Sequence, residues 1–279
     1  MIKKYSLLTV FAFSSLASNA YSVPVIKVLN ATSQDPYTTI KSVFGATAID
    51  NDVADGCSHL GMGSPEDQKH IKKIYDQTLK KWVFQIVSHW NDKDCVTHIP
   101  QKARTEIKVD KDSPLAINKP GGDETTWSFL LKLDDGFTAT DSFTHLFQAK
   151  AENDNSDQFD PRIRLSLYNR NNKLTLELNA SDDDNGFKKL TSVDATPLIG
   201  KWVQVILKAK WSDQGTMEFF LRNQADGKNI SKPYKNTNID LWDTNWGYMR
   251  FKAGIYREYK ENLMTNVSAR FANIRLEKK

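Results

Sequence analysis

The sequence lacks the main features of membrane proteins and of nucleic-acid-binding proteins. The apolar stretch at residues 5–16 is too short to cross a bilayer, and no later segment approaches the ~20 apolar residues that a membrane helix needs. The formal net charge is only +4, from 38 basic and 34 acidic residues, so there is no dense basic footprint for nucleic acid. A local basic patch that faces an acidic ligand is compatible with this charge.

Metal-binding motifs are also absent. The four histidines at positions 59, 70, 89 and 98 do not have the spacing of a zinc motif such as HExxH. The acidic stretches 152–160 and 182–185 carry clustered carboxylates and amides, which hard cations favour, but they lack the ordered spacing of an EF-hand loop. We interpret them as solvated loops, assign no metal ligand and expect no required cofactor. A structural calcium ion is the alternative.

The first twenty residues have the pattern of a cleaved export signal. Met1 to Lys4 form a short basic segment before the apolar stretch, and Ser18-Asn19-Ala20 has the small-x-small form that signal peptidases accept. Cleavage after Ser22 is the alternative. Loss of residues 1–20 removes two lysines and no acid, which lowers the formal net charge from +4 to +2. We expect the remainder, residues 21–279, to be secreted or periplasmic and soluble.

The cysteine content fits such a compartment. Only Cys57 and Cys95 are present, and in an oxidising compartment an even pair predicts one disulfide bond. Two buried thiols are the alternative. The bridge would tie down the irregular region 23–63, which has few strand signals.

After about residue 70, apolar and polar residues alternate between clusters of turn residues, which is the signal of β-strands. One short helix is expected near residues 65–70, where Ser64 precedes a proline. Tight turns and the absence of linkers or repeats predict an all-β, single-domain protein: a two-sheet antiparallel β-sandwich with one or two short helices. We also expect a monomer. The eleven predicted strands are residues 71–75, 80–89, 103–109, 126–133, 143–151, 162–168, 173–179, 202–211, 216–223, 248–257 and 267–276.

The predicted strand 248–257 has two very different faces, because successive side chains of a strand point to opposite sides. One face is apolar and should enter the core: Met249, Phe251, Ala253 and Ile255. The other face carries two cations and two phenols: Tyr248, Arg250, Lys252 and Tyr256. Gly254 would leave an open position where an anionic ring approaches closely. A solvated sheet face with the same residue types is the alternative.

Two other strands have similar polar rows, and a third is harder to assign. Alternation in residues 142–150 places Leu146, Gln148 and Lys150 outward, whereas His145 falls on the inward, more apolar side unless a β-bulge redirects it. If these strands share one sheet, that sheet has a cationic groove. The two clearer rows are Arg162, Arg164, Ser166 and Tyr168 in one strand and Arg104, Glu106 and Lys108 in the other.

Three short motifs on these strands carry a family resemblance: Arg104-Thr-Glu106, Phe143-Thr-His-Leu-Phe-Gln148 and Phe251-Lys-Ala-Gly-Ile-Tyr256. Over about residues 71–279 the sequence resembles the jelly-roll, concanavalin A-like polysaccharide lyases, which include alginate, glucuronan and heparin lyases. The third motif is similar to the family's tyrosine strand, in which a lysine four residues before the catalytic tyrosine faces the cleft. Lys108 stands where the alginate lyases have a second arginine, and His145 precedes Gln148 instead of following it. The match is therefore closer to the glucuronan and heparin branches.

The resemblance implies a lyase that cleaves a glucuronan-, heparin/heparan- or alginate-like polymer by β-elimination. A base removes the uronate proton at C5, and the glycosidic oxygen at C4 leaves. Tyr256 would be the base and then the acid, with Lys252 and Arg250 lowering the pKa of its phenol by their charge. Fixed donors must stabilise the enolate-like charge, and the candidates are Arg104, Gln148 and His145. The expected substrate-binding residues are Glu106, Lys108, Lys150, Arg162, Arg164, Tyr168, Tyr248 and Arg250.

Two other functions occur on sandwich folds. A glycoside hydrolase needs two carboxylates that flank the scissile bond, usually on an acid-rich strand such as E-x-D-x-E, and the sequence has no such strand. A non-catalytic binding module for acidic polysaccharides is the alternative to a lyase, since arginine, lysine and tyrosine can bind a polyanion without cleaving it. The expected partner is an anionic polysaccharide in both cases, and neither nucleic acid nor a membrane.

Overall fold

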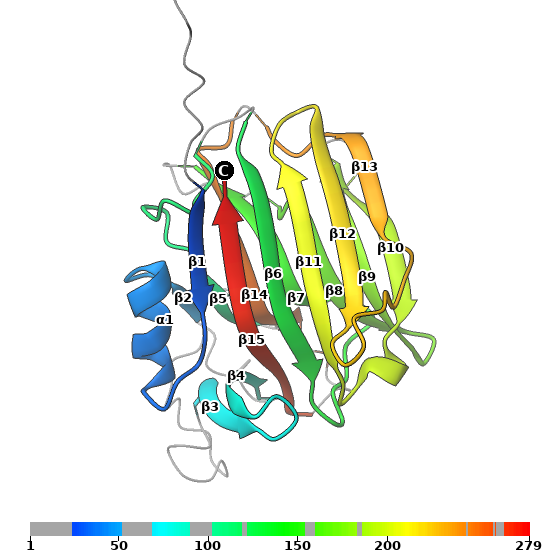
Figure 1. The fold of residues 1–279 in the computed structure, drawn as a ribbon. Helices are drawn as coiled ribbons and strands as arrows, with labels where there is room; N and C mark the ends of the chain where they lie inside the picture. The colour runs from blue at the N-terminus through cyan, green and yellow to red at the C-terminus, as the bar shows by residue number, and fades with distance from the viewer. Residues whose placement is uncertain are drawn as a thin grey trace, which may run out of the picture.

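The computed structural model describes residues 24–51, 69–89, 102–118, 122–153, 160–182, 186–243, 245–258, 260 and 265–279. In this part of the chain, two antiparallel sheets pack face to face, and one α-helix lies beside them (Figure 1). The fold is therefore an all-β, two-sheet sandwich, as the alternation predicts. No helix in the described ranges is both long enough and apolar enough to span a membrane.

The first sheet has eight strands. Seven follow the order β13-β12-β11-β6-β15-β4-β3, and β1 pairs with β15 outside this path. The strands are β1 (Val25–Leu29), β3 (Ile71–Asp76), β4 (Lys81–Ser88), β6 (Glu124–Leu133), β11 (Trp202–Lys210), β12 (Gly215–Asn223), β13 (Tyr234–Ile239) and β15 (Val267–Lys278).

The second sheet has seven strands in the order β10-β9-β8-β7-β14-β5-β2. Its strands β8, β7, β14 and β5 carry the predicted polar rows and are consecutive neighbours, so their outward faces form one surface. The strands are β2 (Ile49–Asn51), β5 (Lys102–Lys108), β7 (Thr144–Glu152), β8 (Ile163–Arg170), β9 (Lys173–Asp182), β10 (Gly186–Asp194) and β14 (Tyr248–Glu258).

The helix α1 (Pro36–Phe44) lies beside β1 and β2 (Figure 1). Asp35 caps it, because its Oδ2 accepts a hydrogen bond of 2.8 Å from the backbone N–H of Thr38. It ends at Gly45, whose φ of 110° favours glycine. A three-residue 3-10 helix, η2 (Thr196–Leu198), follows β10. The helix expected at residues 65–70 falls mostly outside the described residues, and His70, which is described, is not helical.

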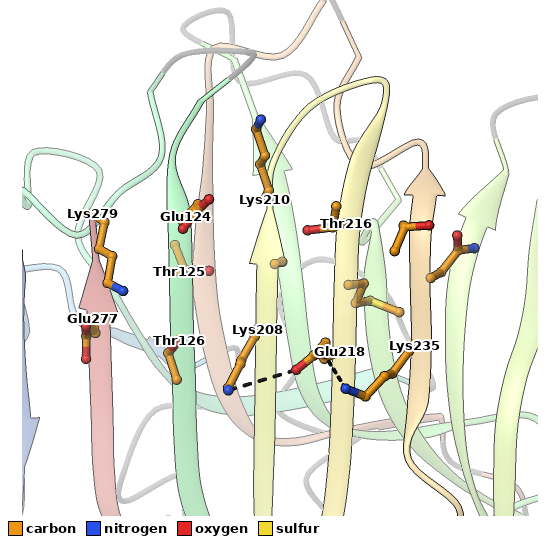
Figure 2. Close-up of a pocket in the computed structure, with 14 residues that line it drawn as sticks. Glu124, Thr125, Thr126, Lys208, Lys210, Thr216, Glu218, Lys235, Glu277 and Lys279 are labelled. Carbon is orange, nitrogen blue, oxygen red and sulfur yellow. Dashed lines mark hydrogen bonds and ion pairs between the residues drawn. The ribbon is translucent and has the colours of Figure 1, made fainter.

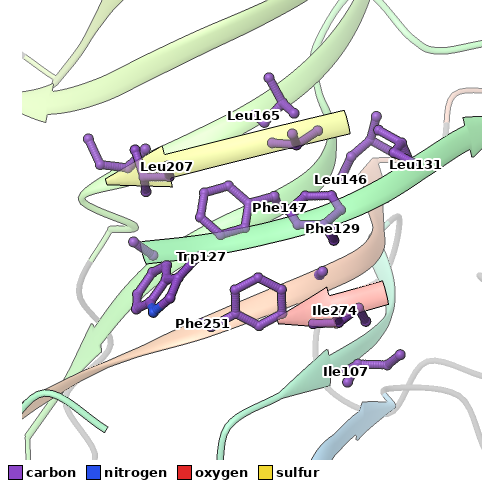
Figure 3. Packing of buried hydrophobic residues seen from close by; sticks show 14 of the residues in the cluster. Ile107, Trp127, Phe129, Leu131, Leu146, Phe147, Leu165, Leu207, Phe251 and Ile274 are labelled. Atoms are coloured by element: carbon purple, nitrogen blue, oxygen red, sulfur yellow. The ribbon is translucent and has the colours of Figure 1, made fainter. Parts of the chain in front are cut away.

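The core between the sheets is rich in aromatic side chains (Figure 3). The Phe129 ring of β6 lies 5.8 Å from Phe147 of β7 and 5.9 Å from Phe251 of β14, measured between centroids. Full burial of such a side chain stabilises a fold by roughly 1.5–3 kcal/mol. Because Phe147 and Phe251 directly neighbour Gln148 and Lys252 in sequence, the core anchors the strands that present the polar surface.

All eleven predicted strands are present, but four others were missed: β1, β2, β10 and β13. Region 23–63 was expected to have few strands, and its described part, residues 24–51, has the two short strands β1 and β2, which pair with β15 and β5. The missed strands are short or lie at sheet edges, where exposed residues give little apolar alternation. The expected export signal, residues 1–20, and both Cys57 and Cys95 lie outside the described residues.

Candidate active site

The outward faces of β5, β14, β7 and β8 carry two rows of polar residues across the sheet. The register of antiparallel pairing defines each row, and the five predicted catalytic residues all lie in them. We call this surface the polar face. The first row is Lys108, Lys252, Gln148 and Arg164, and the second is Arg104, Tyr256, His145 and Ser166.

His145 lies on the polar face because β7 contains a β-bulge. Between the two rows, β14 advances by four residues, β7 by three and β8 by two. The odd step in β7 places two consecutive residues, Leu146 and Phe147, in the core and turns His145 to the same side as Gln148. Simple alternation placed Leu146 outward and His145 inward, and both assignments are wrong for this reason.

Gly254 does not leave the open position that the sequence suggested. A Cβ atom at this residue would lie 2.2 Å from the carbonyl oxygen of Thr105 and 2.6 Å from Cα of Glu106. The space is therefore filled by the backbone of β5. Glycine is needed here so that β14 and β5 can approach closely between the positions of Lys252 and Tyr256.

Tyr256 is partly exposed and lies between an arginine and a histidine. The guanidinium carbon of Arg104 is 5.3 Å from the centroid of the phenol ring. The ring of His145 lies 5.7 Å from the same ring, at an interplanar angle of 64°. Phe143 stacks on His145 with centroids 4.4 Å apart. Tyr256 is thus held in a cage of one cation and two rings.

His145 is buried and electrically neutral at neutral pH. Burial, together with the positive charges of Arg164, Lys150 and Lys102, holds the pKa of its imidazole well below the usual range. Nδ1 of His145 lies 2.7 Å from Oγ of Ser166, which fixes the ring. A neutral imidazole offers one N–H donor and one acceptor. His145 can therefore donate a hydrogen bond or accept one, without adding a charge.

A carboxylate that the sequence analysis did not identify lies among the cations of the polar face. Oδ2 of Asp50, on β2, is 2.6 Å from Nζ of Lys252 and 3.5 Å from Nη1 of Arg104. Its Oδ1 is 3.6 Å from Nζ of Lys108. Burial alone would raise the pKa of Asp50, but the three cations outweigh burial and hold it well below the usual range. Asp50 is therefore ionised.

Glu106 is fully buried beneath the polar face. Its Oε1 accepts a hydrogen bond of 2.5 Å from Nε2 of Gln148. Burial raises the pKa of Glu106, although the charges of Lys252 and Arg104 act in the opposite direction. With no exposed surface, Glu106 contacts Gln148 and fixes the orientation of its amide.

Glu152 joins two of the predicted substrate-binding residues at the end of β7. The hydroxyl of Tyr248 donates a hydrogen bond of 2.7 Å to Oε2 of Glu152, and Nη2 of Arg250 binds Oε1. The prediction of a solvated loop from residue 152 is wrong at this first residue, which belongs to β7. Since the alternation that turns Gln148 and Lys150 outward continues to Glu152, the sequence held the signal for it.

The other predicted substrate-binding residues differ in accessibility. Arg162 is 1% exposed, its Nη2 lies 2.7 Å from Oδ1 of Asp240, and its guanidinium lies 5.1 Å from the ring centroid of Trp246. Tyr168 is 3% exposed. Both residues lie outside the two rows, and Asp240 and Trp246 hold the guanidinium of Arg162. Arg164 is less buried, and its guanidinium stacks on Phe187 of the missed strand β10.

Lys150 lies next to Arg250 in the register and is mostly buried. Burial, with the nearby charge of Lys252, lowers the pKa of its ammonium to about 8. The charge of Lys150 is therefore sensitive to pH near neutrality.

The opposite face of the sandwich has a hollow of about 420 Å³ over β15, β6, β11, β12 and β13 (Figure 2). Its charges alternate in sign across the strands. Oε1 of Glu218 lies 2.6 Å from Nζ of Lys235, and Oε2 lies 3.9 Å from Nζ of Lys208. Such cross-strand pairs are typical of a solvated sheet face. The hollow therefore lacks the concentration of cations that the polar face has.

The described residues contain no group of three or more His, Cys, Asp or Glu side chains arranged to hold a metal ion. Within the acidic stretches considered above, residues 154–159 and 183–185 lie outside the described ranges.

Comparison with known proteins identifies the family. A family model described as polysaccharide lyase matches residues 45–274, a range that includes both rows and Asp50. The chain belongs to this polysaccharide lyase family. It is a polysaccharide lyase on a jelly-roll sandwich. A search of curated proteins gave no match.

Solved structures of alginate lyases have a similar fold. The structure of a family 7 alginate lyase, A1-II′, with one histidine and one tyrosine replaced and a substrate bound, has a TM-score of 0.53 and 12% identity. The similarity covers 77% of this lyase and 87% of that chain. A second structure of A1-II′ has a TM-score of 0.52 and 12% identity, and covers 74% of this lyase and 83% of that chain. At this identity the likeness concerns the fold.

Proposed function

We propose that this polysaccharide lyase cleaves a uronate-containing, anionic polysaccharide by β-elimination, with Tyr256 as the group that moves the proton. The proposal is carried by the register of β5, β14 and β7, which places Tyr256 between Arg104 and His145. The similar alginate lyases act on a polymer of this class. Glucuronan and heparin or heparan sulfate are the other candidate substrates, because the motifs are closer to those branches.

The first requirement of the reaction is to stabilise the charge that develops when C5 loses its proton. Preorganised donors that are aimed at this charge are usually the largest catalytic contribution. Arg104 supplies a cation, Gln148 supplies an amide that Glu106 holds in place, and His145 supplies a neutral donor. We propose that the uronate carboxylate binds against these three side chains.

The second requirement is proton transfer. An unperturbed tyrosine has a pKa of ~10, so at neutral pH its phenol is protonated and accepts a further proton poorly. The guanidinium of Arg104 against the ring, and Lys252 on the same strand face, both favour the phenolate. Tyr256 would take the C5 proton as the C4–O bond breaks and the C4=C5 double bond forms. The same proton would then pass from the phenol to the leaving glycosidic oxygen.

The remaining cations and phenols of the polar face would bind neighbouring sugars, although Lys150 and Arg250 are largely buried before the polymer binds. Arginine and lysine can pair with carboxylates or sulfates, and the tyrosine ring can stack on a pyranose. We assign this role to Lys108, Lys150, Arg164, Tyr248 and Arg250, all of which lie on the outward side of their strands.

Two measurements test the proposal. The purified protein is incubated with glucuronan, alginate, heparin, heparan sulfate or hyaluronan, and the ultraviolet absorbance of the unsaturated product is followed. We expect cleavage of at least one polymer. Tyr256→Phe should lower kcat by about 10²–10⁴-fold and leave polymer binding nearly unchanged.

A matched control is Tyr75→Phe, which changes an exposed tyrosine on the other sheet and should keep wild-type activity. Binding without cleavage of any uronate polymer would show that the substrate class or the chemistry is wrong. A Tyr256→Phe variant with the wild-type rate would show that Tyr256 does not carry the proton.

A further inference from the structure

Asp50 pairs with three cations to which the proposed reaction gives roles at the substrate or at Tyr256. Lys252, Arg104 and Lys108 come from two strands, and all three place a charged nitrogen within 3.6 Å of this one carboxylate. The contact of Lys252 with the neighbouring carboxylate of Glu152 is longer, at 3.9 Å. Asp50 is thus the centre of the cation cluster, although the reaction does not use it.

We propose that Asp50 is a positioning residue of the active site, which orders Lys252, Arg104 and Lys108 and limits the positive charge that the polymer meets. The inference rests on the proposed function and deepens it. It concerns how the cations are held, whichever uronate polymer is the substrate.

Asp50 is well placed to act as a fixed anchor. It lies opposite Glu106 in the pairing of β2 with β5, and Glu106 lies opposite Gly254 in the pairing of β5 with β14. Backbone hydrogen bonds from Lys108 N to Ala48 O, 2.9 Å, and from Asp110 N to Phe44 O, 3.0 Å, continue this attachment beyond β2. The carboxylate is therefore held by the sheet itself.

Lys252 depends on Asp50 more than the other two cations do. Its side chain is only 2% exposed, and a buried ammonium without a partner is costly. The 2.6 Å contact with Asp50 is its shortest described ion pair, whereas Glu152 lies 3.9 Å away. Without the negative charge of Asp50, the Lys252 ammonium would move toward solvent or toward Glu152.

Arg104 transmits the effect to the reacting group. Its guanidinium lies between Asp50, at 3.5 Å, and the ring of Tyr256, at 5.3 Å from the centroid. His145 faces the phenol from β7. Lys102, two residues before Arg104 on β5, lies over the ring of Phe143. Loss of Asp50 would remove one of the contacts that hold the guanidinium over the phenol.

Removing the charge of Asp50 should therefore change binding and turnover in opposite directions. Without the negative charge of Asp50, the three cations would present a larger net positive charge to a polyanion. The polyanion should then bind at least as tightly, and its affinity should depend more steeply on salt concentration. The chemical step would lose the ordered positions of Arg104 and Lys252. A role in folding alone would not separate KM from kcat in this way.

The test uses Asp50→Asn, which keeps the shape and removes the charge, and Asp50→Glu, which keeps the charge. Asp50→Asn should lower kcat by about 10–100-fold without raising KM, and Asp50→Glu should recover part of kcat. The matched control is Glu218→Gln, because Glu218 also bridges two lysines but lies on the opposite face of the sandwich (Figure 2). It should leave both parameters unchanged.

Wild-type kcat in Asp50→Asn, or a rise in KM together with a fall in kcat, would overturn the assignment. Thermal melting of each variant identifies loss of folding, and a destabilised Asp50→Asn with unchanged kcat also contradicts it. If the wild-type protein cleaves no uronate polymer, the proposed function fails by itself. Binding of fluorescently labelled heparin or alginate then tests Asp50 alone, and weaker binding by Asp50→Asn with an unchanged salt slope refutes it.

Discussion

Replacing Gly254 with alanine should disturb the geometry of the active site, although glycine has no side chain that could contact the substrate. The added Cβ would lie 2.2 Å from the carbonyl oxygen of Thr105 and 2.6 Å from Cα of Glu106. Both atoms belong to the backbone of β5, so neither can rotate away. β14 and β5 must therefore separate, at the place where they hold Tyr256 beside Arg104.

The size of the effect follows from this overlap. Overpacking of a core or strand contact costs about 1–3 kcal/mol, and for a chain of this size each kcal/mol lowers Tm by about 2–4 °C. We expect Gly254→Ala to lower Tm by roughly 2–12 °C. The reaction rate should also fall strongly, because a shift of ~1 Å in a reacting group can lower the rate by about 10²-fold.

Circular dichroism melting and the ultraviolet assay of the unsaturated product measure the two effects. Gly122→Ala is the matched control, since a Cβ at Gly122 meets no atom within 4 Å. It should change Tm by no more than about 2 °C and keep the wild-type rate. If Gly254→Ala behaves like Gly122→Ala, the two strands do not approach as closely as the structure shows, and the argument from Gly254 is wrong.

Three further predictions concern the polar face. Lys150, with a pKa of about 8, loses its charge between about pH 7 and 9. Polymer affinity measured by fluorescence should therefore weaken across that range, and it should weaken less in Lys150→Met. Because burial keeps His145 neutral, His145→Gln should retain more kcat than His145→Ala, and equal loss would contradict a donor role. Arg162→Met should lower Tm by several degrees with KM within about twofold of wild type, since Arg162 is buried against Asp240 and Trp246; a large rise in KM would place it in the binding site.

Much of the fold was predictable because one face of most strands is fully buried. In β14, Met249, Phe251, Ala253 and Ile255 all enter the core, and a strand with such a face has only one acceptable side assignment. The same reasoning placed Lys252 and Tyr256 outward. Edge strands such as β10 and β13 bury few side chains, so their sequences lack this constraint.

The errors at the candidate site arose from features that are not local in sequence. The bulge at Leu146 is visible only from the pairing of β7 with both of its neighbours, and no residue type marks it. Asp50 belongs to a strand of three residues, which is too short to show alternation. Its importance comes from contacts with Lys252, which lies about two hundred residues away in the chain.

The polar face is ordered mainly by the protein itself, and this affects how it can bind a polymer. Lys252, Gln148 and His145 are each nearly fully buried, with Asp50, Glu106 and Ser166 as their respective hydrogen-bond partners. Partners of this kind reduce the reorganisation needed during the reaction, which favours catalysis. They also satisfy charges that a polyanion would otherwise neutralise. At each of these side chains, the binding free energy is therefore only the difference between the contact with the polymer and the contact within the protein. Tight binding then requires contacts along several sugars.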